Sequence, residues 1–537
     1  MRLTYEGLKN PKFWEKAEIE LPPYNPEEIA QKTKKNPLWV HFGIGNIFRI
    51  FIGGIADKLI RAGLTDRGII CVETFDYDVV DKIYRPFDNL ALAVTLHADG
   101  RTNKRVLGSL SEALKARSSN PEEWARLKEI FTADSLQLVS FTITEKGYSL
   151  RNADGRYFPH VDNDMNNGYN NSIGIIAIVA SMLYERWKAG AKPLALVSMD
   201  NISHNSEKLR ESVIEISETW ERKKFVPAEF VDYVKNENKI SFCWTMIDKI
   251  TPRPSEKIAE TLEELGLENM QPVITSKKTY IAPFVNAEAP EYLVIEDSFP
   301  NGRPAFESAG VYMTDRHTVN LSEQMKVTAC LNPIHTALCT FDCMLGYKFF
   351  ADGMNDPELS KLAHEVGYTE GLPVVEDPKI ISPEKFLEEV INIRFHNIYL
   401  GDTSARIAVD ISQMIGIRFG ETIKAYLSRY GTAKKLNAIP LAIAGWLRYL
   451  LAVDDEGNKI ELSPDPMIPE LRKQLQSIEF GNPKTFFGQL KPILSNKNIF
   501  GVNLYEAGVG NKIENMFRDM LASQGAVRAV LKKYLAG

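Results

Sequence analysis

Between about residue 37 and residue 300, short apolar runs alternate with segments of helical spacing. The run "PLWVHFGIG" is apolar, contains a β-branched residue and ends in glycine, which predicts a strand followed by a turn. The next segment, "NIFRIFIGGIADKLIRAG", places Ile47, Ile50, Phe51 and Ile55 at helical spacing before a glycine stop. The alternation continues through the strand-like runs "GIICVETFD", "LALAVTLHAD", "LQLVSFTITEKGY", "PLALVSMDN", "ISFCWTMID" and "YLVIEDSF", with helices over "SIGIIAIVASMLYERWKAG" and from about residue 206. This pattern predicts an α/β fold with a mostly parallel, helix-flanked sheet.

Helical periodicity dominates from about residue 311 onward. The segments "PEKFLEEVINIRF", "TAKKLNAIPLAIAGWLRYLLAV" and "NKIENMFRDMLASQGAVRAVLKKYL" have no convincing strand series between them. The first 36 residues are polar, Lys/Glu-rich and interrupted by proline, which predicts an extension packed on the outside. We therefore expect an N-terminal extension (1–36), a Rossmann-type α/β domain (37–310) and a second, mostly α-helical C-terminal domain (311–537).

The stretch "HFGIGNIF" places two glycines between a predicted strand and a predicted helix. In a dinucleotide-binding turn, the first glycine allows the tight bend. The second lets backbone N–H groups reach a pyrophosphate at the helix N-terminus. Phe48 stands where the usual motif has a third glycine, so a plain strand-to-helix turn is the alternative. We predict a nucleotide cofactor bound by Gly43, Gly45, Asn46, Ile47 and Phe48.

Acidic residues follow the second predicted strand, in "CVETFD". A carboxylate there accepts hydrogen bonds from the ribose 2′-hydroxyl and repels a 2′-phosphate, which favours NAD over NADP. Glu73 and Asp76 are the candidates, and neither is flanked by an arginine or lysine. The alternative is that both are solvated loop acids.

Polar groups gather at the ends of three further predicted strands. Open α/β sheets bind ligands beyond the carboxyl ends of their strands, although Asp and Asn are also ordinary caps and turn residues. The residues in question are Thr144, Glu145 and Lys146, then Asp200, Asn201 and His204, and then Asp248 and Lys249.

The segment "KVTACLNPIHTALCTF" combines an apolar helical stripe with Lys326, Asn332 and His335. Asn332 before Pro333 predicts a helix start with Asn at the N-cap and Pro at the first helical position. Proline also disfavours the α conformation for the residue before it. On an unbroken helix Lys326 and His335 would point about 180° apart, so the break is what lets them converge. Glu323 shares a face with Lys326 if that stretch is helical. The alternative is a capped helix with a lysine that reaches solvent and a histidine satisfied in the core.

Composition argues against several other classes of protein. The 537 residues are 44% hydrophobic and 25% charged, as in a globular protein with two or more domains. A net charge of −6 and a pI near 5.9, without a Lys/Arg block, argue against nucleic acid and membranes as partners. No apolar run has the length of a signal or a membrane span, and five scattered cysteines without a CxxC pair predict reduced thiols and a cytoplasmic location. The cysteine, histidine and acidic residues show no zinc-ligand clusters, so we predict no metal site.

Six blocks of the chain, taken together, are similar to one known family. The blocks "GIGNIFR", "TITEKGY", "MDNISHN", "TMIDKITP", "KVTACLNPIHTAL" and "RFHNIYLGDTSARIA" resemble, in this order, the polyol-specific long-chain dehydrogenase/reductase family. That family includes mannitol 2-dehydrogenase, fructuronate reductase and tagaturonate reductase. The wording "CLNPIHTAL" and the long N-terminal extension resemble the fructuronate reductase branch most.

The resemblance implies an NAD-binding Rossmann domain, a helical substrate-binding domain and metal-independent hydride transfer. By motif, Lys326 would be the general acid/base, Asn201 and Asn332 would hold the reacting oxygen, and His335 would orient the substrate. Glu323 takes the position of an acid that links the lysine to solvent. Desolvation lowers the pKa of a lysine toward neutrality, and two amide donors on one oxygen act as an oxyanion hole. The polyol members have four residues between the lysine and the asparagine, whereas "VTACL" makes five, so the register of Lys326 is the point a structure tests.

A keto-hexuronate would also need a cation for its carboxylate. Arginines in "RFHNIYLGDTSAR" suit a carboxylate, and the alternative is that they pair with Asp402 or Asp410. We expect interconversion of D-fructuronate and D-mannonate, with tagaturonate reduction or mannitol/polyol 2-dehydrogenation as rivals. A non-catalytic NAD- or sugar-binding regulator is the rival from another class. The candidates for substrate binding are Asp248, Arg394, His396 and Arg406.

Overall fold

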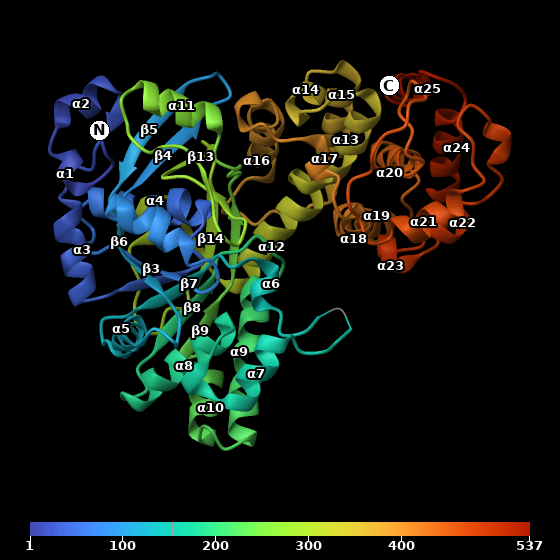
Figure 1. Ribbon diagram of the computed structural model, residues 1–537. Coiled ribbons are helices and arrows are strands. Elements are labelled where there is room, and N and C mark those ends of the chain that lie inside the picture. Colours follow the sequence, from blue (N-terminus) through green and yellow to red (C-terminus); the bar gives the residue numbers. More distant parts are fainter. Residues whose placement is uncertain (153, 537) are drawn as a thin grey trace. The chain divides into compact units, whose positions relative to one another are not determined.

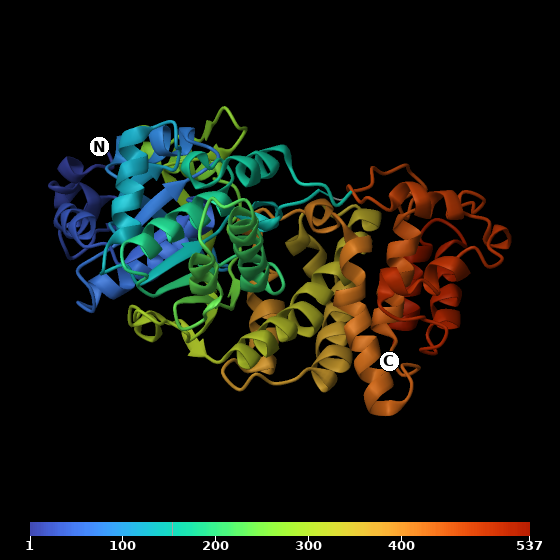
Figure 2. The same ribbon diagram turned by 90° about the horizontal axis from the view of Figure 1, so that it is seen from below.

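The computed structural model describes residues 1–152 and 154–536. The chain divides into two compact units, unit 1 (Met1–Asn320) and unit 2 (Leu321–Gly537). Every sheet formed by the described residues lies in unit 1, whereas unit 2 is built of helices (Figures 1 and 2). The prediction of a Rossmann-type domain followed by a helical domain is therefore confirmed. No helix in the described part of the chain is both long and apolar enough to cross a bilayer. The five cysteines are free, as predicted.

A six-stranded sheet forms the centre of unit 1. All its pairings are parallel and its order is β6-β3-β2-β7-β8-β9, the 3-2-1-4-5-6 order of a dinucleotide-binding sheet. The sequence pattern missed β6 because its "LSEALK" alternates weakly, yet this strand extends the sheet beside β3. The strands are β2 (Trp39–Phe42), β3 (Ile69–Glu73), β6 (Leu110–Lys115), β7 (Leu138–Phe141), β8 (Leu194–Ser198) and β9 (Ile240–Cys243).

Two apolar cores cover the faces of this sheet. On one face, Val40 and Phe42 pack with residues of α5 (Pro121–Thr132), α8 (Ile175–Lys188), α9 (Asn205–Arg222) and α10 (Ala228–Lys235). On the other face, Trp39 packs with η1 (Phe48–Ile52), a π-helical turn, and with α4 (Gly53–Arg61). Layers of this kind hold the carboxyl ends of the parallel strands at one edge, where the glycine turn leaves β2.

Three predicted strand runs lie wholly or partly in smaller sheets, and one of them, "YLVIEDSF", forms β14 (Tyr292–Glu296). The alternation of strands and helices had placed the run "LALAVTLHAD" in the central sheet. Instead, this run forms β4 (Ala91–Leu96), which pairs antiparallel with β5 (Thr102–Leu107) in a separate sheet. The run "ISFCWTMID" divides at Trp244 into β9 and β10 (Thr245–Asp248), and β10 pairs with β14 (Tyr292–Glu296). The remaining strands are β1 (Ile19–Glu20), β11 (Val273–Ile274), β12 (Tyr280–Ile281), β13 (Phe284–Glu288) and β15 (Tyr312–Thr314).

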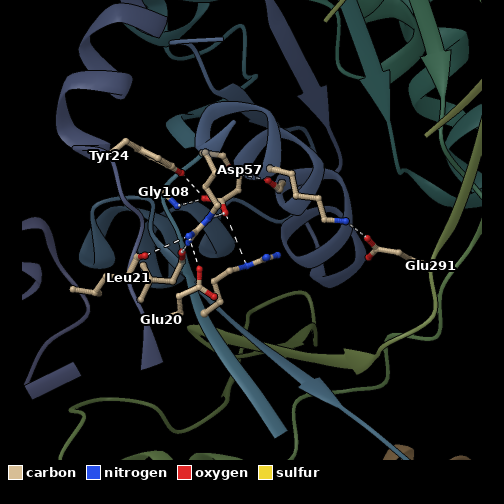
Figure 3. A network of polar contacts seen from close by, with 12 residues as sticks. Glu20, Leu21, Tyr24, Asp57, Gly108 and Glu291 are labelled. Carbon is tan, nitrogen blue, oxygen red and sulfur yellow. Dashed lines mark hydrogen bonds and ion pairs between the residues drawn. The ribbon is translucent and has the colours of Figure 1, made fainter. Parts of the chain in front are cut away.

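The N-terminal extension is part of unit 1 and not a loose covering. Leu3 and Trp14 have no exposed surface, and β1 adds a parallel strand to β5. The fully buried carboxylate of Asp57 on α4 accepts hydrogen bonds from the hydroxyl of Tyr24 and from Arg61 Nε at 2.5 Å (Figure 3). A buried carboxylate needs such donors, so the network fixes the extension to α4. The helices of the extension are α1 (Tyr5–Leu8), α2 (Pro11–Lys16) and α3 (Pro26–Lys35).

Unit 2 is organised around two long apolar helices, α13 (Asn332–Leu345) and α20 (Ala438–Tyr449). Gly445 allows their close contact, because a Cβ there would lie 2.4 Å from the ring of Phe341. Helix α12 (Arg316–Met325) leads into α13 through the π-helical turn η6 (Lys326–Cys330). The other described α-helices of at least seven residues in unit 2 are α15 (Pro357–His364), α16 (Pro383–Glu389), α19 (Glu421–Tyr430), α21 (Ile468–Leu475), α24 (Gly510–Met520) and α25 (Ala526–Tyr534).

Candidate active site

The glycine turn after β2 has the geometry that the motif predicted. Gly43 has φ +89°, and a Cβ there would lie 2.0 Å from the carbonyl oxygen of Thr142. A Cβ on Gly45 would meet no atom within 4 Å. The first glycine is therefore required by the fold, and the second keeps open the space that a ligand approaching the backbone needs. The side chain of Asn46 is held by Arg49 Nη2 at 2.7 Å.

A chain of hydrogen bonds runs from Trp39 to this turn beneath the sheet edge. Trp39 Nε1 donates to Ser140 Oγ (2.7 Å), which contacts His41 Nδ1 (2.6 Å). His41 Nε2 contacts Thr142 Oγ1 (2.9 Å), which donates to the Gly43 carbonyl (2.7 Å). Because an indole N–H only donates and a carbonyl only accepts, the order is complete only with the proton of a neutral His41 on Nε2. Burial lowers the pKa of His41 well below its usual value, in agreement with the neutral form.

The two acids predicted to select the cofactor have different surroundings. Glu73 Oε1 accepts the backbone N–H groups of the three residues that follow it, at 2.9–3.2 Å, and burial raises the pKa of Glu73. Asp76 is almost fully buried, and its Oδ2 accepts the hydroxyls of Thr275 (2.6 Å) and Thr279 (2.5 Å). Asp76 thus anchors the 275–279 loop and is not the solvated loop acid of the alternative interpretation.

A cavity of about 610 Å³ opens beside Phe75, just past the end of β3. Sequence spacing indicated no cation near the strand end, but folding brings basic residues to this cavity from distant segments. Its basic lining residues are Lys115, Arg117 and Lys277.

The segments that follow β7 and β8 meet at Asp200. The carboxylate of Asp200 accepts the N–H groups of Ile143 (2.8 Å) and Thr144 (3.0 Å) and the hydroxyl of Tyr148 (2.6 Å). Burial raises the pKa of Asp200, and these donors oppose the shift. The ends of β7 and β8 are therefore joined by a cluster that sequence analysis identified only as separate strand ends.

The other strand-end candidates take separate positions. Asn201 is exposed in the loop after β8, and Asp248 is the buried last residue of β10. Glu145 is exposed and pairs with Lys208 at 2.8 Å. Their roles in binding stay predictions.

In unit 2, the residue that lengthens the Lys326–Asn332 spacing is taken up by a π-helical turn. Lys326 opens η6, and the N–H of Leu331 bonds to the Lys326 carbonyl at 3.1 Å, five residues back. A π-helical turn holds one residue more than an α-helical turn, and such turns are frequent at functional sites. Lys326 is 1% exposed, and Glu323 on the preceding helix is also buried. The structure thus accommodates the five-residue spacing without moving Lys326 out of the helical segment.

Asn332 is not the N-cap that the sequence predicted. Leu331, with φ −136° and ψ −68°, precedes the helix, and α13 begins at Asn332 itself with Pro333 in its first turn. The π-helical turn shifts the break one residue earlier, which is why the prediction was wrong. The Asn332 side chain makes no hydrogen bond in residues 1–152 and 154–536. Its amide is therefore free to bind a ligand.

His335 lies between aromatic rings on the first turn of α13. The ring centroids of Phe395 and Phe350 are 4.5 Å and 4.8 Å from its own. Burial lowers the pKa of His335 to about 3; Asp402 opposes this shift, and nearby arginines add to it. Those arginines are Arg418, Arg394 and Arg406.

Comparison with known proteins decides the family. Residues 38–308 match the mannitol dehydrogenase Rossmann domain, and residues 319–521 match the mannitol dehydrogenase C-terminal domain. The chain belongs to the mannitol dehydrogenase family. The resemblance carried by the six sequence blocks is thereby confirmed, and the chain is a member of a family of oxidoreductases.

Relatives in the mannitol dehydrogenase family cover almost the whole chain. D-mannonate oxidoreductase of Thermotoga maritima is 52% identical over 99% of this chain and 99% of its own length. The crystal structure of a substrate-free D-sorbitol dehydrogenase has a TM-score of 0.78 at 25% identity, covering 96% of this chain and 98% of that one. Mannitol 2-dehydrogenase of Pseudomonas fluorescens, in a ternary complex with NAD and D-mannitol, has a TM-score of 0.73 at 24% identity over both full chains.

The arginines predicted to bind a substrate carboxylate are not equivalent in this member of the mannitol dehydrogenase family. Arg406 is exposed and makes two bonds of 2.6 Å to Asp402, which matches the structural alternative. Arg394 is buried, with its guanidinium 6.0 Å from the Phe386 ring. His396 contacts Asn355 at 3.2 Å. Arg418 lies in no motif that the sequence analysis singled out, yet it is one of the arginines that lower the pKa of His335.

Proposed function

We propose that this chain is an NAD-dependent oxidoreductase that interconverts D-fructuronate and D-mannonate. The observation that carries the proposal is the 52% identity over 99% of both chains to a D-mannonate oxidoreductase. Oxidation of the secondary alcohol at C5 of D-mannonate gives D-fructuronate, which is the keto-acid that we propose as the partner substrate.

The residues of the glycine turn fit a dinucleotide. Open space at Gly45 and the left-handed Gly43 suit a pyrophosphate against the backbone of residues 43–48. When bound, the cofactor supplies or accepts the hydride. We assign discrimination against a 2′-phosphate to Glu73 alone, because Asp76 is almost fully buried and its Oδ2 already accepts two threonine hydroxyls. We also propose Thr144 and Glu145, at the end of β7, as cofactor contacts, because the sequence predicts a binding site at the carboxyl ends of the strands.

Unit 2 supplies the acid/base chemistry in this proposal. In the reducing direction the ketone carbon gains a hydride and its oxygen gains a proton from the ammonium of Lys326; the reverse direction returns both. The free amide of Asn332 donates to that oxygen, a role also proposed for Asn201, and His335 orients the sugar. Glu323 lies buried one turn before Lys326 and would return the proton from solvent. The near-complete burial of Lys326 supports the proposal, since a lysine is rarely buried in a protein interior.

A substrate panel tests the proposal. The chain is assayed with NADH, and separately with NADPH, against D-fructuronate, D-tagaturonate and D-fructose. The expected result is the highest kcat/KM for fructuronate with NADH. A preference for tagaturonate or for uncharged fructose would transfer the assignment to a tagaturonate reductase or a polyol 2-dehydrogenase. Binding of NADH without any turnover would support the non-catalytic regulator.

A further inference from the structure

Arg418 is a half-buried cation without a carboxylate partner. It lies in the π-helical turn η11 (Gly416–Gly420), and its Nη1 donates to Thr336 Oγ1 at 2.7 Å. In residues 1–152 and 154–536 its side chain makes no other hydrogen bond and no ion pair. A guanidinium has five N–H donors, so four are open. None of its nitrogens is sealed from solvent without a partner, so these donors can reach a ligand.

Hydrogen bonds connect Arg418 to the start of α13. Thr336 accepts from Arg418 and donates its own hydroxyl to the Asn332 carbonyl at 3.0 Å. Thr336 directly follows His335, so the guanidinium lies at the turn that presents the free Asn332 amide and the His335 ring. The electrostatic effect of Arg418 on His335 agrees with this proximity.

The position of the Arg418 turn is fixed by backbone packing. A Cβ on Gly420 would lie 2.0 Å from the Phe500 carbonyl oxygen, and one on Gly416 would lie 2.7 Å from that of Ile499. These contacts seat η11 against the end of α23 (Lys497–Phe500), and Phe419 is fully buried beside them. The guanidinium is therefore held on a rigid support, which favours recognition of one ligand geometry.

The other basic side chains near His335 are less suited to bind an anion. Asp402 neutralises Arg406 through two bonds of 2.6 Å. Arg394 is 3% exposed and has other interactions in the fold. Arg418 alone among these three combines partial burial with open donors.

We propose that Arg418 binds the carboxylate of the sugar-acid substrate and separates hexuronates from neutral keto-sugars. The inference rests on the proposed function and adds the residue that recognises the acid. A guanidinium fork forms two parallel, charge-assisted hydrogen bonds to a carboxylate, whereas the hydroxymethyl group of a neutral sugar offers no charge. Partial desolvation strengthens such a pair relative to water.

The test compares charged and neutral substrates in Arg418→Gln and Arg418→Lys. For Arg418→Gln we expect the KM for D-fructuronate to rise about 100-fold or more, with kcat changed much less. The kcat/KM for D-fructose is expected to stay within about threefold of wild type. Arg418→Lys keeps the charge but not the fork, so a loss of about tenfold is expected. Arg429→Gln is the matched control, because Arg429 is exposed on α19 and, among the described residues, its side chain bonds only to the Pro373 carbonyl.

Inhibition of the wild-type chain gives a second measurement that needs no variant. D-gluconate and D-sorbitol differ by one carboxylate, and gluconate is expected to compete with substrate about 100-fold better. Equal inhibition by the two would overturn the inference. So would an Arg418→Gln variant, folded by circular dichroism, that loses fructuronate and fructose turnover equally, since that is the result of a structural role through Thr336. A wild-type chain inactive on both fructuronate and tagaturonate is a different result, because it removes the proposed function itself.

Discussion

The glycine turn of unit 1 and the start of α13 in unit 2 satisfy their polar groups in opposite ways. At the turn, hydrogen bonds run without interruption from Trp39 through His41 to the Gly43 carbonyl. At the start of α13, the Asn332 amide and most of the Arg418 donors have no partner in the described chain. A site that binds a ligand through its backbone needs a fixed backbone conformation, so the neighbouring side chains form hydrogen bonds that hold that conformation. A site that acts through side chains has to leave them open.

Substitution of Lys326 should have the largest effect that distinguishes the start of α13 from the glycine turn, because it should affect catalysis and not cofactor binding. Lys326→Ala is expected to lower kcat by about 10³-fold or more, because general acid/base catalysis is lost. The Kd for NADH, measured by fluorescence titration, should stay unchanged because the glycine turn is intact. Lys348→Ala, at an exposed position, is the control and should leave kcat unaltered. A normal rate in Lys326→Ala would remove the lysine from the mechanism.

Helix α13 also carries a buried carboxyl group, in contrast to the polar side chains at the start of the helix that lack partners in the described chain. Asp342 has no exposed surface, its Oδ2 accepts the Ser404 hydroxyl at 2.7 Å, and its Oδ1 has no hydrogen-bond partner among the residues that the structure describes. Burial raises the pKa of Asp342 to about 8, from 3.8 in the unfolded chain. Between these values the unfolded chain releases the proton and the folded chain keeps it, so the free energy of unfolding falls as the pH rises.

Asp342→Asn should therefore stabilise the protein at high pH. At pH 8 the free energy of unfolding is expected to be higher than that of wild type by a few kcal/mol, roughly, with little difference at pH 4. Urea unfolding at both pH values measures it. Glu260→Gln, at an exposed position on α11 (Glu256–Glu264), serves as the control, because Glu260 does not contribute to the pKa shift of Asp342. A wild-type stability that does not decline over this range would contradict a protonated Asp342.

The two glycines of the turn should fail in different ways. Gly43→Ala puts a Cβ 2.0 Å from the Thr142 carbonyl oxygen at φ +89°, so we expect a loss of about 2–3 kcal/mol in the free energy of unfolding. Gly45→Ala meets no protein atom, so the melting temperature should be unchanged while the Kd for NADH rises about tenfold. Thermal melts and fluorescence titrations of both variants decide this. Equal destabilisation would show that Gly45 is also structural.

The same contrast explains how much the sequence could predict. The turn was predictable because its requirement is local: only glycine adopts the conformation of residue 43 without strain, and it follows an apolar strand. The helical nature of unit 2 followed from periodicity in the same way. Strand β6 was missed because its polar residues hide the pattern, and pairing with β3 decides its structure.

The candidate site in unit 2 was only partly predictable. Residue types identified Lys326, Asn332 and His335, but the π-helical turn that absorbs the added residue depends on packing, and the cap was placed one residue late. Arg418 bonds to a residue 82 positions away in the chain, a contact that no local pattern encodes. The pairing of Arg406 with Asp402 at i,i+4 was visible as an alternative, but which arginine stays open was not.

Substitution of His41 tests the hydrogen-bond chain at the glycine turn and should have the smallest effect of these substitutions. His41→Leu leaves the Ser140 hydroxyl and Thr142 Oγ1 each without one partner, so we expect a loss of about 1–2 kcal/mol in the free energy of unfolding. The Kd for NADH should rise a few-fold, because the Gly43 carbonyl is less firmly held, and kcat should stay unchanged. Nitrogen-15 NMR of the wild-type chain tests the tautomer directly. The imidazole signal of His41 is assigned as the one that is missing from the spectrum of His41→Leu, and we expect it to be that of a neutral ring protonated on Nε2. Since burial lowers the pKa of His41 well below its usual value, this signal should not titrate between pH 6 and 8. A His41 that titrates in that range would gain a second proton on Nδ1, so Ser140 could no longer donate to it, and the uninterrupted hydrogen-bond chain that distinguishes the turn from the start of α13 would be broken.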